Sequence, residues 1–84
     1  MICRIAKTMT LPSGAVADTH AALTVRIEGA ALSVVIASFG AASPMPLMTW
    51  ELPLASTLPE GGTTNAWVLA ALLATAEFEG GTEC

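Results

Sequence analysis

The sequence predicts an α+β fold: a small antiparallel β-meander of three to four strands with one C-terminal helix. Residues 22–28 alternate strictly between apolar and polar side chains, the pattern of a half-buried strand. Residues 32–39 follow a Gly-Ala turn and are dense in β-branched side chains, as in the second strand of a hairpin. Residues 65–76 place leucines at helical spacing. A chain of 84 residues has room for one domain, spanning residues 1–84.

The N-terminal part of the sheet is predicted from residues 2–11, which are rich in β-forming side chains and threonine. Pro12, Ser13 and Gly14 follow at once and predict a chain reversal. Residues 15–19 are compatible with a short return strand or with an irregular connection. In residues 22–28 every second side chain, beginning with Leu23, is apolar, and we expect these side chains to face the core.

The strand predicted over residues 32–39 differs from its neighbour because both of its faces are apolar. One face carries Leu32, Val34 and Ile36, and the other carries Val35, Ala37 and Phe39. Such a strand lies beneath a covering helix or presses against a neighbouring chain. Residues 40–47 hold two prolines and predict a loop. Residues 48–52 alternate again and predict a short strand that Pro53 closes.

The domain therefore divides into a sheet region (residues 1–54), a loop (55–62), a helical region (63–79) and a loose tail (80–84). Thr63 or Thr64 is suited to cap the helix N-terminus. One predicted helix face carries Leu69, Leu72, Leu73 and Ala76. The opposite side is also apolar, through Trp67, Val68, Ala71 and Ala74. A helix that avoids water on nearly every side is buried between two layers or in an oligomer.

Composition excludes several classes of function. Hydrophobic residues make up 54% of the chain and charged residues 12%, more apolar material than a small monomer readily buries. Three basic residues stand against seven acidic ones, which argues against nucleic-acid binding. The charge-free residues 29–50 have the length of a membrane span, but Gly40, Pro44 and Pro46 interrupt them.

No constellation of residues predicts an enzyme, a metal site, a cofactor or a small-molecule substrate. His20 is the single histidine, and no nucleophile motif surrounds it, so we interpret it as structural. Cys3 and Cys84 lack the spacing of zinc ligands and are interpreted as free thiols, although a bridge is open to them if the termini meet. Gly61 and Gly62 precede the helix without the lysine of a P-loop.

The surplus of apolar side chains predicts protein interfaces. The predicted interface residues lie on the strand that is apolar on both faces, on the next strand and on the helix: Val35, Ala37, Phe39, Trp50, Trp67, Val68 and Ala71.

A series of short motifs carries a resemblance to a known class of proteins. The motifs are, in order, Lys7-Thr8, Leu11-Pro12-Ser13-Gly14-Ala15, His20, Val25-Arg26-Ile27, Val34-Val35-Ile36-Ala37-Ser38, Leu58-Pro59 and Phe78-Glu79-Gly80. Together they resemble small proteins of tailed bacteriophages and prophages, encoded near tail and fibre genes. The chain departs from that pattern at residues 39–50, which carry no charge where the pattern is polar and charged.

The resemblance implies a structural component of the virion, in the tail, the baseplate or a fibre attachment. Its partners would be other tail or baseplate proteins and copies of itself, and it would assemble in the host cytoplasm. Two alternatives belong to other classes. One is a holin-like small membrane protein that uses residues 29–47 and 63–76 as membrane segments. The other is a small non-virion regulator that binds a host protein.

Overall fold

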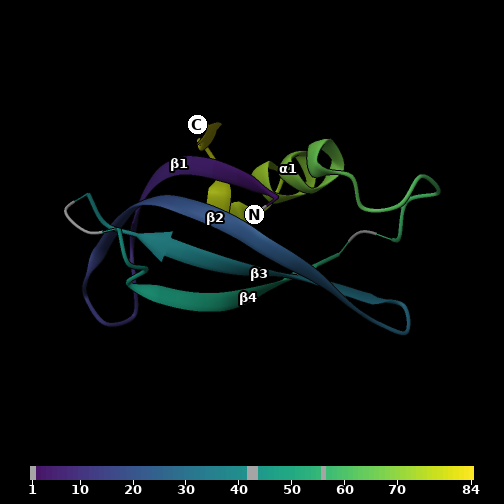
Figure 1. Cartoon of the computed structure of the whole chain (residues 1–84), viewed down its shortest axis with the longest axis horizontal. Helices are drawn as coiled ribbons and strands as arrows, with labels where there is room; N and C mark the ends of the chain where they lie inside the picture. Colours follow the sequence, from purple (N-terminus) through teal and green to yellow (C-terminus); the bar gives the residue numbers. More distant parts are fainter. Residues whose placement is uncertain (1, 42–43, 56) are drawn as a thin grey trace.

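The computed structural model describes residues 2–41, 44–55 and 57–84 and shows one five-stranded antiparallel sheet with a helix against it (Figure 1). The elements, in chain order, are β1 (Cys3–Thr10), β2 (Val16–Glu28), β3 (Ala31–Phe39), β4 (Met48–Leu54), α1 (Asn65–Leu73), the 3-10 turn η1 (Ala76–Phe78) and β5 (Thr82–Glu83). The strand order is β4-β3-β2-β1-β5. Strands β1 to β4 are thus sequential neighbours, which confirms the predicted meander.

The sheet has five strands rather than three to four, because the tail predicted to be loose forms β5. Ile5 pairs with Glu83 and Ala6 with Thr82, so the C-terminus lies along β1. Gly80 has a φ of +82°, which favours glycine at this turn. Gly81 allows the close approach, since a Cβ there would lie 2.9 Å from the Ile5 side chain. A strand of two residues has no periodicity for sequence reasoning to detect.

β2 is much longer than the strand predicted from residues 22–28, and it contains a β-bulge. Ala22 pairs with Ile36 and Thr24 with Val35, which leaves Leu23 as the extra residue. The expected burial of this apolar parity is wrong in part. Val25 is half-buried against the core, but Leu23 is 41% exposed and Ile27, near the β2–β3 turn, is 51% exposed. The bulge moves Leu23 out of the alternation and onto the face away from the helix.

Strand β4 and helix α1 end at positions that differ from the sequence prediction. β4 continues through Pro53 to Leu54, which an edge strand tolerates because one side of its backbone has no strand partner. Thr64 caps α1, since its hydroxyl accepts a hydrogen bond from the backbone N–H of Trp67 at 3.2 Å. The helix stops at Leu73 instead of continuing to residue 76, and η1 replaces its last turn.

The core lies between one face of the sheet and the two helical elements. Its fully buried members come from β1, β3, α1 and η1: Ile5, Val34, Ile36, Val68, Leu72 and Phe78. We call this side of the sheet the covered face. The opposite side, the open face, has no helix over it within the described parts of the chain. In α1 the residues buried in this core are Val68 and Leu72, whereas Leu69 and Leu73 are half-buried and pack against it.

Candidate functional site

Three polar side chains meet in the core and form a closed hydrogen-bond network. His20 on β2 pairs directly with Ser38 on β3, and its Nδ1 lies 2.7 Å from the Ser38 Oγ. Its Nε2 lies 2.9 Å from the backbone oxygen of Lys7. The Trp50 Nε1–H donates to the same Ser38 Oγ at 2.8 Å. Because a carbonyl can only accept, Nε2 carries the imidazole proton and the Ser38 hydroxyl donates to Nδ1.

The distance between the Ser38 hydroxyl and the His20 imidazole is that of a nucleophile and its general base, but the surroundings of the pair indicate a structural role. Both residues are buried, and Ser38 is fully so. A serine nucleophile must meet its substrate, and this hydroxyl is enclosed by His20 and Trp50. Among the described side chains, no buried nitrogen or oxygen lacks a hydrogen-bond partner. The network therefore stabilises the core and links four strands, β1 through the Lys7 carbonyl and β2, β3 and β4 through the three side chains.

The neutral imidazole suits this environment. Burial, the largest influence, lowers the pKa of His20 from its ordinary value of 6.5. The hydrogen bond to the Lys7 carbonyl and the charge of Asp18 oppose that shift, while the charge of Lys7 adds to it. Phe78 stands edge-on to the His20 ring with centroids 5.3 Å apart, and stacks on Trp50 at 5.9 Å. A protonated ring would place a charge in this apolar site, and the Ser38 hydroxyl would have to accept from Nδ1 instead of donating to it.

Cys3 begins β1 and Cys84 directly follows β5, the neighbouring strand, yet the two side chains lie on opposite faces of the sheet. The Cys84 backbone N–H donates to the Arg4 carbonyl oxygen at 3.2 Å, so the two ends of the chain do meet. Cys3 packs against the core, whereas Cys84 follows the parity of Arg4. Both thiols are free. Burial, and secondarily the charge of Glu83, raises the pKa of Cys3, which favours the unreactive thiol.

The open face carries an apolar centre with charged residues around it. Cross-strand partners share a face, so the register places Ala21, Val35, Ala37 and Phe39 together there. The bulged Leu23 lies on the same face, since it lines a groove with Ala21 and Phe39. The two alanines form a buried floor, and the larger side chains are half-buried or exposed. A shallow groove of about 380 Å³ runs across it, lined by Arg4, Thr19, Ala21, Leu23, Phe39, Gly40 and Pro44.

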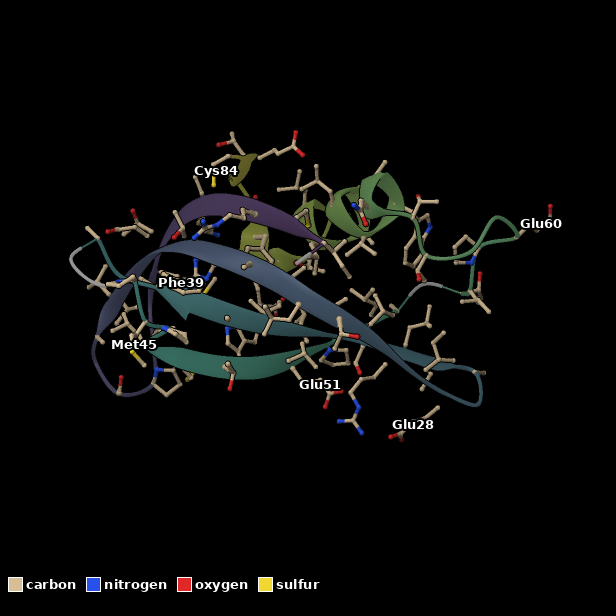
Figure 2. The ribbon with its side chains drawn as sticks, in the orientation of Figure 1. Glu28, Phe39, Met45, Glu51, Glu60 and Cys84 are labelled. Carbon is tan, nitrogen blue, oxygen red and sulfur yellow. The ribbon has the colours of Figure 1, made fainter. Side chains whose placement is uncertain are left out.

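Charged side chains lie at two places on the open face. The guanidinium carbon of Arg4 lies 5.3 Å from the centre of the Phe39 ring, in cation–π contact. Toward the β2–β3 hairpin tip, Arg26 forms ion pairs with Glu28 at 3.2 Å and Glu51 at 3.3 Å. Figure 2 shows Phe39 separated from Glu28 and Glu51 along the sheet. The cation–π contact of Arg4 with Phe39 and the ion pairs of Arg26 therefore lie in different parts of the open face.

The predicted interface residues divide according to the face they occupy. Val35 and Phe39 lie half-buried on the open face. Ala37 is buried in its floor. Trp50 is half-buried and bonded to Ser38, and Val68 is buried in the core, so Val68 presents no surface to a partner.

The helix adds a second set of partly exposed apolar side chains. Trp67 and Ala71 are half-buried on α1, beside the core. Sequence reasoning missed the exposed position of Leu23 because strict alternation had assigned it to the core. Its bulge has no signal in the sequence.

In the described ranges, no group of three His, Cys, Asp or Glu side chains is placed to hold a metal ion. None of the helical residues that the structure describes forms a helix of the length and apolarity needed to cross a bilayer. The holin-like alternative required the helical region as a membrane segment, and α1 has only nine residues.

Comparisons with known proteins identify no relative. No protein family, no curated protein and no solved structure matches this chain.

Proposed function

We propose that this chain is a structural component of a tailed-phage virion, in the tail, the baseplate or a fibre attachment, and that it works by protein–protein assembly. The apolar centre of the open face is the observation that supports protein–protein assembly. Leu23 is 41% exposed there, and Val35 and Phe39 are half-buried with no helix over them in the described residues. Burial of apolar area stabilises association by about 25 cal/mol per Å².

The virion setting rests on the series of motifs from Lys7 to Gly80. The buried network of His20, Ser38 and Trp50 is consistent with an assembly role, because its hydrogen-bonding groups are bonded within the core and are not directed at a ligand. The proposed partners are other tail or baseplate proteins and copies of this chain. Half-buried Trp67 and Ala71 on α1 supply a second apolar surface, so one molecule has two sides with which to contact neighbours.

Peptide mass spectrometry of purified particles tests this function. We expect the chain in particles at a fixed ratio to the major tail proteins. Val35→Glu should reduce its incorporation about tenfold or more, because a carboxylate would be desolvated in the interface. Leu58→Glu is the matched control, since Leu58 is 54% exposed in the loop before α1. Its incorporation should stay unchanged.

Other outcomes point to other functions. A chain found free in infected cells and missing from particles would support a regulator that binds a host protein. A chain recovered in the membrane fraction would support the holin-like alternative. Circular dichroism of each variant checks that a loss of incorporation does not come from unfolding.

A further inference from the structure

The charges of this acidic protein are unevenly divided between the two sides of the sheet. The register places Arg4, Arg26, Glu28 and Glu51 on the open face, two charges of each sign. The remaining charged side chains are Lys7, Asp18, Glu60, Glu77, Glu79 and Glu83. The whole formal charge of -4 therefore lies off the open face. Two copies repel each other through most of their surface, but can approach through this neutral face.

The charged residues of the open face are also arranged so that the face complements itself. Arg4 on β1 pairs with Ala21, which pairs with Ala37. Glu51 lies on β4, three strands away from β1, and pairs with Val35, two residues along β3 from Ala37. Arg4 and Glu51 thus stand on opposite sides of the apolar centre. A two-fold axis in the plane of the face, passing between them, brings Arg4 over the partner's Glu51 and repeats the contact in reverse.

The apolar centre lies on that axis and would meet its own copy. Leu23, Val35 and Phe39 would pack across the interface over the alanine floor. Four strands about 4.8 Å apart and nine residues of about 3.4 Å give a face of roughly 500 Å². Two such faces bury on the order of 1,000 Å², the lower end of specific interfaces. This size suits a reversible dimer rather than an obligate one.

We propose that the open face binds a second copy of this chain, sheet against sheet, with Arg4 of each copy beside the partner's Glu51. The inference deepens the proposed function, on which it rests, by naming the occupant of one surface. The half-exposed side of α1 then remains for other proteins of the particle. In the dimer, the ion pairs of Arg26 and the cation–π contact of Arg4 with Phe39 become partly shielded from water, which strengthens them.

Sedimentation velocity of the full chain over a wide concentration range tests this dimer. We expect the wild type to dimerise reversibly, and Leu23→Glu to raise the dimer Kd about tenfold or more. Leu58→Glu introduces the same charge at an exposed position in the loop before α1 and should leave the Kd within about twofold of the wild type. A monomeric wild type at every concentration, or equal weakening by both variants, would overturn the proposal.

A charge exchange tests the orientation independently of the apolar contact. Arg4→Glu and Glu51→Arg should each weaken the dimer, because each places like charges together across the axis. The double variant should recover most of the lost affinity, since it restores opposite charges at both contacts. Glu77→Arg changes the net charge as Glu51→Arg does, but in η1, and should not weaken the dimer. A double variant weaker than both singles would rule out this orientation.

The two proposals fail in different ways. A monomeric chain that is present in purified particles overturns the dimer alone. A dimeric chain that is missing from particles overturns the virion function alone.

Discussion

Two valines that are neighbours in β3 illustrate how differently the two faces of this sheet are used. Val34 is completely buried on the covered face, beneath α1 and η1. Val35 points to the open face and is half-buried. The residue type and the strand are the same, so the difference comes from what lies over each face. The covered face supplies stability, and the open face remains available for association.

The largest contrast is expected between the two phenylalanines. Phe78→Ala removes a fully buried ring that contacts His20 and Trp50, and should cost about 3–5 kcal/mol of unfolding free energy. Phe39→Ala, on the open face, should cost much less and should weaken dimerisation instead. Urea denaturation measures the first effect and sedimentation the second. Equal destabilisation by both would show that the open face also belongs to the core.

A smaller contrast is expected between two serines of β3. Ser38→Ala leaves the Trp50 Nε1–H without its acceptor and His20 Nδ1 without its donor, and should cost about 1–3 kcal/mol. Ser33→Ala loses only a hydrogen bond to Glu51 at the surface. We expect that variant to stay within about 0.5 kcal/mol of the wild type. Thermal unfolding of the pair checks the difference.

The smallest effect is a pH dependence that only the covered face should show. The pKa of His20 is lowered in the folded state, so below its ordinary value of 6.5 the unfolded chain binds a proton that the folded chain does not. Stability should be full above pH 6.5 and fall as the pH drops toward the folded-state pKa. The slope is at most about 1.4 kcal/mol per pH unit.

Urea titrations between pH 7 and pH 5 measure this slope. His20→Gln should be less stable at pH 7 but should lose the slope in this range. A slope that persists in the variant would assign the dependence to other groups.

The local features of this fold were predictable because short-range patterns specify them. The β-branched strand after Gly29 and the cap at Thr64 both appear where the sequence indicates them. Each depends on a few adjacent residues. The two apolar faces of β3 were also evident in the sequence, and the structure places Val35 and Phe39 half-buried on the open face; their part in an interface stays a prediction.

The candidate site itself was only partly predictable. His20 was interpreted as structural, but its bonded partner Ser38 lies 18 residues away in the sequence. Trp50, which donates to Ser38, lies a further 12 residues along the chain, so no local pattern joins the three. The bulge at Leu23 reverses the parity of β2 without any glycine or proline to mark it. The neutral charge of the open face also required the strand register, because Arg4 and Glu51 are far apart in sequence.

The sequence by itself determined the order of the strands, the place of the helix and the excess of apolar side chains, since these follow from composition and short-range periodicity. Tertiary structure alone decided which side of α1 is buried, because apolar residues surround that helix and leave no preferred side. It also decided that the tail returns to β1 and that one face of the sheet stays open. Those outcomes depend on contacts between distant residues, which local alternation does not encode.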